Sequence, residues 1–421
     1  MMVFSTKEVI QKIAEEHGTP FYLYDAHVLS KSFLALREAL PKEVDIFYSI
    51  KANPNIALCS QLRKLGSCAE LCSFYEIQAA LKAGFTPENI IFVGPAKTDK
   101  EIVACLELGI YALVCESQHE LKRISELARQ RNITARVALR INPSHVSKTA
   151  LLKMGGKPSQ FGMDEEQVFN NKDYFISMPN IQIMGIHIYN GTRILTADTI
   201  VENTQYILEL ASRLSTDWQI KFEMIDIGGG LGIPYFDNEE ELNINELKIK
   251  LEPIIKQYIA NFPQTRIILE SGRYLVATCG ALVSRIVDIK HSKGEQFAIT
   301  DGGTNCHMAA VGVGSFIKRN FPIKAVRQNE NLSDGFEEYN ITGPLCTPGD
   351  LIGKQVLLPT LTIGDFILVI NSGAYGPTAS PVMFLSHGFP AEILYQTDNF
   401  RLIRERFTEE EFLGKQYFIN T

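Results

Sequence analysis

The feature that most constrains the fold is a regular alternation of short apolar runs and amphipathic stretches, from about residue 28 to residue 275. The apolar runs are typical of buried strands and include VDIFYSI, NIIFVG, ARVALRI, IMGIHIY, FEMIDIGGG and RIILESG. Stretches with helical periodicity lie between them, at 56–65, 100–108, 118–131 and 196–214. Such alternation predicts a parallel sheet with helical crossovers, and its length favours a closed β/α barrel over 28–275.

The sequence pattern changes near residue 276. Beyond it lie β-branched runs with turn signals, among them LVSRIVDIK, FAITDGG, KQVLLPTLTIGDFILVI and AEILY. We therefore expect a second, mainly β domain over 276–421, completed by the N-terminal residues 1–27. A chain of 421 residues also exceeds the roughly 250–300 residues that one hydrophobic core serves, which favours two domains.

Charge and composition exclude several classes of protein. The 41 basic and 48 acidic residues give a net charge of −7 without a block of like charge, so no nucleic-acid partner is expected. No apolar run reaches the roughly 18 residues of a membrane span, and charged residues near the start leave no signal-peptide core. We expect a cytoplasmic protein without a membrane partner. The eight cysteines lack C-x-x-C spacing, so neither a metal site nor a disulfide framework is predicted.

Lys51 stands at the end of a strand-like run, in FYSIKANPN. Active sites of β/α barrels lie at the carboxyl ends of the strands, where a lysine can be desolvated and nucleophilic. The alternative is a lysine that only extends its ammonium group into solvent at a strand end.

A glycine run follows another predicted strand, in DIGGGLGIP. The backbone N–H groups of Gly228, Gly229 and Gly230 can converge on an anion such as phosphate, because no side chain stands in the way. The run matches neither G-x-G-x-x-G nor the P-loop, which disfavours dinucleotide and ATP sites. A plain tight turn is the alternative.

Two further segments contain residues suited to chemistry. Glu270 and Arg273 end a strand in ESGR, and they form either a surface pair or a site for a phosphorylated pyridine. In the pyridine site the carboxylate would hold the ring nitrogen protonated, and the guanidinium would bind phosphate. Cys346 in GPLCTPGD and Tyr375 in NSGAYG lie among turn residues, where an accessible thiol can transfer a proton, although either segment could be structural.

Together these motifs resemble, in order and spacing over nearly the whole chain, the pyridoxal-phosphate (PLP) decarboxylases of the alanine-racemase-like fold. That family includes diaminopimelate and ornithine decarboxylases. The resemblance implies a (β/α)8 barrel with a second β domain, PLP as cofactor, and a homodimer with shared active sites. Lys51 is then the Schiff-base lysine, Glu270 the partner of the pyridine nitrogen, and Cys346 the acid that reprotonates the product in the partner subunit's site. The phosphate cradle would comprise Gly228, Gly229, Gly230, Arg273 and Tyr375.

The resemblance also suggests supporting roles. Glu70, Arg140 and Asp350 fall in family-like contexts, where an ion pair in the protein interior is the alternative. Thr347 and Asp350 follow the reactive cysteine and are expected on the substrate side of the site.

The sequence departs from the family pattern where the cofactor ring should be covered. The family's ring-stacking histidine belongs to a strand written H-x-H-x-G-S, and this chain has His187-Ile-Tyr-Asn-Gly-Thr192. Tyr189 therefore takes the stacking position, with His187 two residues earlier on the same strand face. Either ring could cover PLP, and Thr192 is expected beside the cofactor.

Two further departures concern the substrate. Thr347 stands where diaminopimelate and ornithine enzymes carry an acidic residue that holds the distal ammonium of the substrate. The arginine that diaminopimelate decarboxylases carry in R-P-x-L-Y should fall near Ala309 and is absent, unless Arg319 or Arg327 replaces it from a shifted loop.

The segments KMGGKPSQFGMDEE, GPLCTP and SGAYGPTASPVMFLSHGFPAEIL resemble instead a subgroup that acts on conjugated substrates. That subgroup includes the butirosin decarboxylase of carrier-protein-bound glutamyl groups and the citryl-amino-acid decarboxylases of siderophore pathways. The resemblance predicts a PLP-dependent α-decarboxylase of an amino acid conjugated at its distal end, either tethered to an acyl carrier protein or joined to citrate. The alternatives are meso-diaminopimelate decarboxylase of lysine biosynthesis and an inactive regulatory homologue.

Overall fold

The computed structural model describes residues 7–144, 152–153, 158–311, 319–328, 335–417 and 419. The chain divides into two compact units. One consists of Ser30–Ile233 and Glu240–Leu275, and we call it the barrel unit. The other, the β unit, consists of Met1–Leu29, Pro234–Glu239 and Val276–Thr421. The short segment Pro234–Glu239 groups with the β unit, although the alternation of strands and helices places it within 28–275.

The barrel unit is built on eight parallel strands that close on themselves. Their order around the barrel is β5-β4-β3-β2-β12-β11-β9-β6, and β5 pairs with β6 to complete the ring. A closed parallel barrel was the architecture expected from the alternation of strands and helices. The strands are β2 (Val44–Ser49), β3 (Cys68–Leu71), β4 (Ile90–Phe92), β5 (Ala112–Cys115), β6 (Ala135–Asn142), β9 (Ile181–His187), β11 (Met224–Asp226) and β12 (Arg266–Ser271).

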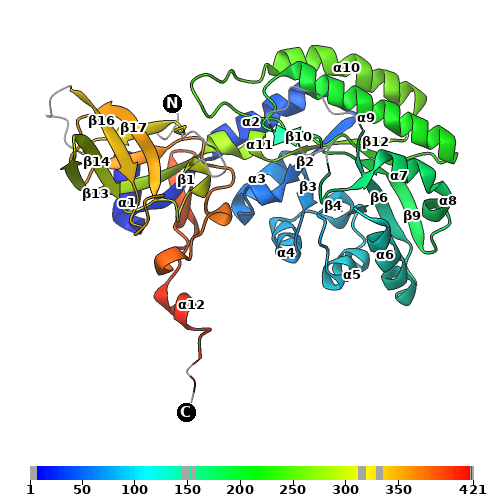
Figure 1. The fold of residues 1–421 in the computed structure, drawn as a ribbon, viewed down its shortest axis with the longest axis horizontal. Helices are drawn as coiled ribbons and strands as arrows, with labels where there is room; N and C mark the ends of the chain where they lie inside the picture. Colours follow the sequence, from blue (N-terminus) through cyan, green and yellow to red (C-terminus); the bar gives the residue numbers. More distant parts are fainter. Residues whose placement is uncertain are drawn as a thin grey trace. The chain divides into compact units, whose positions relative to one another are not determined.

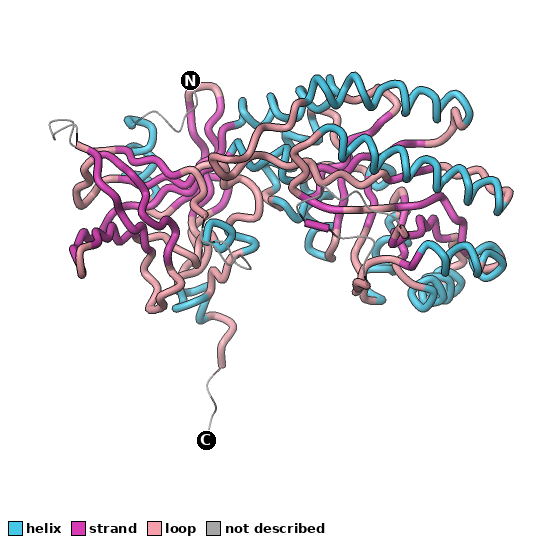
Figure 2. The backbone as a smooth tube through the Cα atoms, turned by 45° about the horizontal axis from the view of Figure 1, so that its top comes forward, coloured by secondary structure: helices cyan, strands magenta, loops and turns pink. Residues whose placement is uncertain are grey.

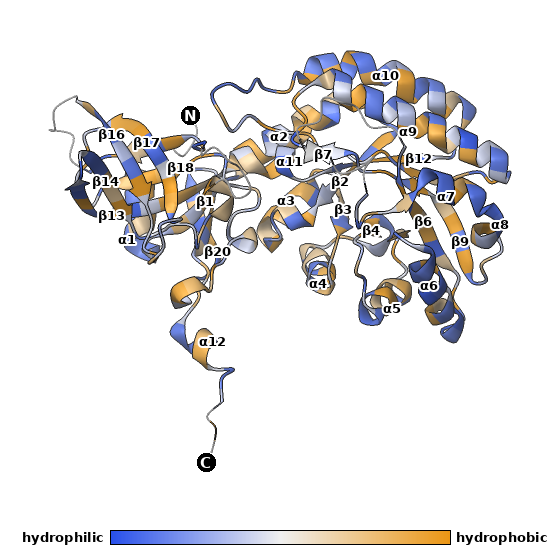
Figure 3. Ribbon diagram, in the orientation of Figure 1, coloured by the Kyte–Doolittle hydropathy of each residue, from blue (hydrophilic) through white to orange (hydrophobic). Residues whose placement is uncertain are grey.

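Apolar side chains from these strands fill the interior of the barrel. Phe47, Ile91, Ala138, Met224 and Ile268, each from a different strand, belong to one buried cluster. In Figure 3 the strands β9 and β12 are largely hydrophobic, whereas helix α6 (Gln118–Gln130) on the outside is largely hydrophilic. The barrel is therefore a packed core, and only its strand ends are available for a site.

Helices cover the outside of the barrel (Figure 1). A capping box between Thr98 and Glu101 starts α5 (Asp99–Leu108), and left-handed glycines Gly84 and Gly109 follow the last residues of α4 (Phe74–Ala83) and α5. The long helices α9 (Ala197–Trp218) and α10 (Ile244–Asn261) lie side by side (Figure 2). Further helices are α2 (Ala26–Ala39), α3 (Ile56–Lys64), α7 (Glu165–Asn170), α8 (Lys172–Ile176) and α11 (Arg273–Val276).

Short strand pairs add to the barrel unit. The strand β8 (Met163–Asp164) pairs with the end of β6, and β7 (Leu152–Lys153) pairs with β10 (Gly191–Thr192).

In the part of the β unit that the structure describes, nine strands form a mixed sheet. The central strand β13 (Gly280–Ser292) pairs antiparallel with β1 (Phe21–Asp25), with β14 (Glu295–Thr300) and with β18 (Phe366–Val369). The run KQVLLPTLTIGDFILVI forms two strands, because a turn at Thr362–Asp365 separates β17 (Leu351–Pro359) from β18. The other elements are α1 (Lys7–His17), β15 (Ile323–Val326), β16 (Phe336–Thr342), β19 (Ala391–Gln396), β20 (Asn399–Arg404) and α12 (Glu409–Leu413).

Helix α1 and strand β1 show why the N-terminal residues belong to the β unit. Ile10 and Ile13 of α1 pack in one buried cluster with Phe21, Val283 and Ile393. Strand β1 lies between β13 and β19, so its backbone bonds to segments more than 250 residues away. Among the described residues, no helix combines the length and the apolar character that a membrane span needs.

Candidate active site

Ionisable side chains gather at the carboxyl ends of neighbouring barrel strands. Parallel strands present these ends at one edge, so residues far apart in the sequence become neighbours. Lys51 lies in the single turn Ile50–Ala52 directly after β2. The other members of the group are Glu70 on β3, Arg140 on β6, His187 at the end of β9, Asp226 at the end of β11, and Glu270 on β12.

The Lys51 ammonium forms an ion pair with Glu70. Its Nζ lies 2.8 Å from Oε1 and 3.0 Å from Oε2 of Glu70, whose side chain is fully buried. Cys72 completes this cluster, with its Sγ 3.2 Å from Glu70 Oε1 and 3.9 Å from Lys51 Nζ.

Burial alone would lower the pKa of Lys51, but the charge of Glu70 outweighs it and raises that pKa well above its usual value. Cys72, Glu270 and Tyr189 act in the same direction. Desolvation alone would have favoured the neutral, nucleophilic amine. Lys51 is instead an ammonium in this structure. The physical reason is the buried carboxylate beside it.

A second cluster lies at the ends of β9, β11 and β12. His187 Nε2 lies 3.0 Å from Glu270 Oε1, and both side chains are buried. Asp226 joins them, since one donor atom from each of the three residues lies within 4.8 Å of the others. Such a set could also hold a cation, but His187 Nε2 and Glu270 Oε1 already bond to each other.

The two carboxyl groups of this second cluster differ in their protonation. Burial would raise the pKa of Glu270, but His187, Lys51 and Arg140 together hold it well below its usual value. Burial and the neighbouring Glu270 raise the pKa of Asp226 well above its usual value. These directions favour ionisation of Glu270 and protonation of Asp226. His187 Nε2 must donate to Glu270, because an ionised carboxylate only accepts.

The glycine run forms a tight turn against the same strand ends. A Cβ on Gly229 would lie 1.6 Å from the carbonyl oxygen of Glu270, and one on Gly230 would lie 2.0 Å from that of Gly191. Gly228 and Gly230 also have positive φ values of 65° and 79°. Only glycine fits here, and the turn keeps backbone groups close to the Glu270 strand.

The other barrel residues predicted from the sequence lie nearby along the chain. Tyr189 follows β9, and Thr192 in β10 adjoins the glycine turn, since its Cα would lie 3.3 Å from a Cβ on Gly230. Arg273 begins α11, one residue after Gly272, which packs against Ser49 and Ala52 beside Lys51.

Arg140 forms a buried ion pair with Glu116, a residue that the sequence analysis missed. Arg140 Nη1 lies 2.8 Å from Glu116 Oε1. Glu116 also accepts hydrogen bonds from the backbone N–H groups of Gly94 and Gly162. The sequence signal was available, because Glu116 directly follows the apolar strand ALVC just as Glu270 ends another.

In the β unit, Cys346 lies in a loop that Asp350 holds closed. The Asp350 carboxylate is buried and accepts from the backbone N–H groups of Thr304, at 2.6 Å, and Leu345, at 2.7 Å. Cys346 is exposed, whereas the other seven cysteines, all among the described residues, are buried or half-buried. Both oxygens of Asp350 are therefore engaged by backbone N–H groups, one from the loop itself and one from the segment at Thr304.

Tyr375 lies in a second constrained loop of the β unit. It has a φ of 54°, and Asn371 in the same loop has a φ of 59°, a region that residues with side chains rarely adopt. Ser372 and Gly373 donate backbone hydrogen bonds to Gly280 and Ala277. Strain of this kind persists where surrounding contacts over-determine the loop, and it is concentrated at functional sites.

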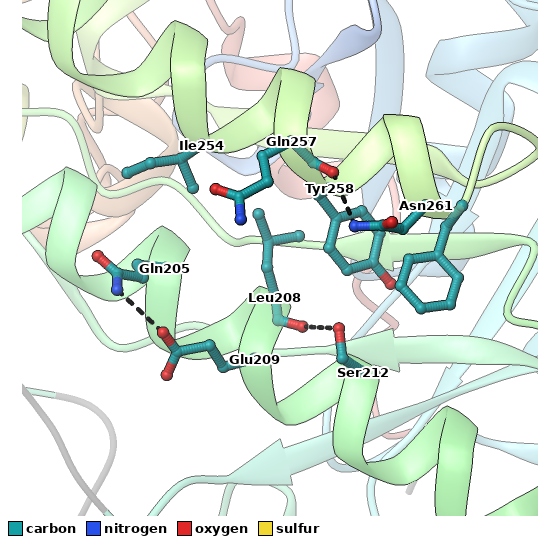
Figure 4. Close-up of a pocket in the computed structure, with 9 residues that line it drawn as sticks. Gln205, Leu208, Glu209, Ser212, Ile254, Gln257, Tyr258 and Asn261 are labelled. Atoms are coloured by element: carbon teal, nitrogen blue, oxygen red, sulfur yellow. Dashed lines mark hydrogen bonds between the residues drawn. The ribbon is translucent and has the colours of Figure 1, made fainter.

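A cavity of about 360 Å³ lies elsewhere in the barrel unit. Figure 4 shows residues of α9, such as Gln205 and Glu209, facing residues of α10, such as Gln257 and Asn261. Its lining comes from these outer helices and the adjoining Phe262, and none of the strand-end residues described above contributes to it.

Comparisons with known proteins identify the family. The model for the pyridoxal-binding domain of the pyridoxal-dependent decarboxylases matches residues 26–277. The chain is 40% identical over 410 residues to L-glutamyl-[BtrI acyl-carrier protein] decarboxylase of Niallia circulans, covering 97% of this chain and 96% of that protein. It is 29% identical over 397 residues to 2-[(L-alanin-3-ylcarbamoyl)methyl]-2-hydroxybutanedioate decarboxylase of Staphylococcus aureus, covering 92% and 97%.

A solved structure extends this likeness to both units. Diaminopimelate decarboxylase of Helicobacter pylori, complexed with L-lysine, superposes with a TM-score of 0.86 at 30% identity, covering 96% of this chain and 98% of that one. The fold is thus the barrel-plus-β-domain fold of these PLP enzymes. The chain belongs to the pyridoxal-dependent decarboxylases and is a PLP-dependent amino-acid decarboxylase.

Proposed function

We propose that this enzyme decarboxylates the α-carbon of an amino acid whose distal end is conjugated, and that the substrate is a glutamyl group carried as a thioester on an acyl carrier protein. The observation that carries the proposal is the 40% identity, over nearly the full length of both chains, to a decarboxylase with that substrate. The identity to the superposed diaminopimelate decarboxylase is 30%. A citryl amide is a second substrate of the same kind, supported by the Staphylococcus aureus relative.

The loop around Cys346 supports a substrate without a distal ammonium. Residues 343–350, all described, contain one carboxylate, that of Asp350, and backbone N–H groups engage both of its oxygens. Thr347, directly after Cys346, offers a hydroxyl where an ammonium would need a negative charge. A free ammonium would lose its water there without compensation. Asp350 in this proposal positions the loop and does not contact substrate.

The barrel residues fit PLP. Lys51 provides the amine that its aldehyde needs, and the turn at Gly228–Gly230, which only glycine can form, offers the backbone N–H groups of Gly229 and Gly230 to the phosphate. The N–H of Gly228, also expected there, bonds to Asp226 instead. Arg273, Thr192 and Tyr375 complete the phosphate contacts in this proposal. Bound PLP withdraws the electrons left on the substrate carbon when carbon dioxide departs.

The ionised Glu270 holds a proton on the ring nitrogen, which improves that withdrawal. Glu70 takes up the Lys51 ammonium whenever the lysine is released, because the two groups already form an ion pair. Tyr189 would cover the ring face. His187 is committed to Glu270 by its hydrogen bond, so it is the weaker candidate for stacking.

Cys346 returns a proton to the product carbon from a partner subunit. Its thiol is exposed on a loop whose shape Asp350 fixes, as a group that serves a neighbouring site requires. The proposed assembly is therefore a homodimer with shared sites.

The experiment is release of carbon dioxide from three substrates: a glutamyl carrier-protein thioester, a citryl diamino acid and meso-diaminopimelate. We expect turnover of a conjugated substrate and little from meso-diaminopimelate. Thr347→Asp restores the acidic residue and should move activity toward meso-diaminopimelate, whereas Thr347→Asn, of similar size but uncharged, should not. Equal turnover of meso-diaminopimelate and the conjugates by the unmodified enzyme would contradict the proposal.

A further inference from the structure

The buried pair of carboxyl groups, Glu270 and Asp226, poses a problem of charge. Their side chains are 2% and 0% exposed, and their oxygens lie within 4.8 Å of each other. Two ionised carboxylates cannot share such a site, so one of them must hold a proton. Which one is ionised matters, because only an ionised Glu270 can hold a proton on a ring nitrogen.

His187 makes the two carboxyl groups unequal. It lies opposite Asp226 in the register of β9 and β11, yet its Nε2 bonds to Glu270 on the next strand, at 3.0 Å. Asp226 receives one backbone N–H, that of Gly228, at 2.8 Å on Oδ1, and its Oδ2 meets no hydrogen-bond donor among the described residues. A buried oxygen without a donor is costly when charged, whereas a protonated Asp226 can itself donate to Glu270.

Two other charged residues, Lys51 and Arg140, face Glu270, but each of them also pairs with a second carboxylate. Lys51 and Arg140 lower its pKa less than His187 does, and Lys51 is itself paired with Glu70. Arg140 is paired with Glu116. His187 is thus the group dedicated to Glu270. Its Nδ1 has no partner among the described residues, so the hydrogen bond to Glu270 is the one that its ring makes there.

We propose that His187 is a positioning residue that assigns the negative charge to Glu270 and the proton to Asp226, and so determines how well the protein holds a protonated cofactor ring. This inference rests on the proposed role of Glu270. In this proposal His187 does not stack on the cofactor ring. Asp226, which lies beside the glycine run, is the neighbouring carboxyl group that holds the proton.

The test measures cofactor affinity and does not depend on activity. Apoprotein is titrated near neutral pH with PLP and with 1-deazapyridoxal phosphate, which has carbon in place of the ring nitrogen. The ratio of the two dissociation constants reports the contact to the ring nitrogen alone. The unmodified protein should prefer PLP by about 10- to 100-fold, the range of a hydrogen bond to a charged group. Glu270→Gln should remove most of that preference.

Variants of His187 and Asp226 then test the role of His187 separately. His187→Leu should reduce the preference for PLP by about tenfold while leaving affinity for the deaza analogue within about threefold, because the pocket remains folded. His187→Gln keeps an N–H donor and should retain most of the preference. The double variant His187→Leu/Asp226→Asn should regain preference, because a neutral residue at position 226 leaves Glu270 without a competitor for the charge.

The possible outcomes separate the role of His187 from the role of Glu270. If the unmodified protein binds PLP and its deaza analogue equally, the assignment of Glu270 fails and this inference fails with it. If Glu270→Gln removes the preference but His187→Leu retains it, the role of His187 is wrong and the assignment of Glu270 stands. Equal weakening of both ligands by His187→Leu, without recovery in the double variant, would show a purely structural histidine.

Discussion

Lys51 illustrates how a single residue acquires its chemistry from neighbours that are distant in sequence. A lysine at the end of a barrel strand is a candidate nucleophile by position. Its state in the structure is decided by Glu70 on the next strand, which lies 2.8 Å away and raises the pKa of the amine. The pair keeps a free lysine charged and in place, so cofactor attachment requires removal of a proton.

We therefore predict that Glu70→Gln lowers the pKa of Lys51. Attachment of PLP requires the neutral amine, so its pH profile should move to lower pH, by about 1–3 units, as for loss of an adjacent opposite charge. The measurement is the rate of borohydride-trapped attachment at Lys51 against pH, read by peptide mass. Glu88→Gln, at an exposed position, is the control. A profile that does not move would show that Glu70 does not govern the amine.

At this scale Lys51 and Glu270 are predictable from their position at strand ends, and Glu70 from its family-like context. The contacts that each residue makes are not predictable in this way. His187 was expected as a possible stacking ring, but the register of three strands brings its Nε2 to Glu270. Glu116 directly follows the apolar run ALVC, which marks it as a strand-end residue, but its pairing with Arg140 on the adjacent strand cannot be read from local sequence.

At the scale of elements, the alternation of strands and helices predicts the barrel well, because each strand and its helix are consecutive in the chain. The β unit is harder to predict. Strand β1 pairs with β13 and β19, and no local signal in FYLYD identifies partners so far away. The glycine turn after β11 is an intermediate case. The sequence predicts either an anion-binding loop or a plain tight turn, and the structure shows a turn packed against the backbone of Glu270.

Gly229→Ala should therefore weaken PLP binding by at least about tenfold. The added Cβ would lie 1.6 Å from the Glu270 carbonyl oxygen, so the turn and the strand must separate. Gly349→Ala is the matched control, since its Cβ would meet nothing nearer than 3.9 Å. Equilibrium titration of both apoproteins with PLP makes the comparison. Unchanged affinity in Gly229→Ala would show that the turn does not cradle the cofactor.

At the scale of the whole molecule, the candidate residues are divided between the two units. Lys51 and Glu270 belong to the barrel unit, and Cys346 and Tyr375 belong to the β unit. In the proposed homodimer, Cys346 serves the site of the partner subunit. A mixture of two inactive variants then tests the arrangement without a structure of the assembly.

Mixing Lys51→Ala with Cys346→Ala subunits should restore up to about a quarter of the activity. Random pairing makes half of the dimers mixed, and each mixed dimer has one intact site of two. Subunit exchange is verified with differently tagged chains, and the activity of the mixture is compared with that of each variant alone. Mixtures that exchange subunits yet remain inactive would place both residues in the site of one chain.

The most direct test of the central claim is the ratio of kcat/KM for a glutamyl carrier-protein thioester to kcat/KM for meso-diaminopimelate. Thr347 and the engaged carboxylate of Asp350 leave the Cys346 loop without a free negative charge for a distal ammonium. We predict a ratio of at least about 10³, equivalent to roughly 4 kcal/mol of transition-state discrimination. A ratio near one, with robust decarboxylation of free meso-diaminopimelate, would contradict the account and indicate an enzyme of lysine biosynthesis.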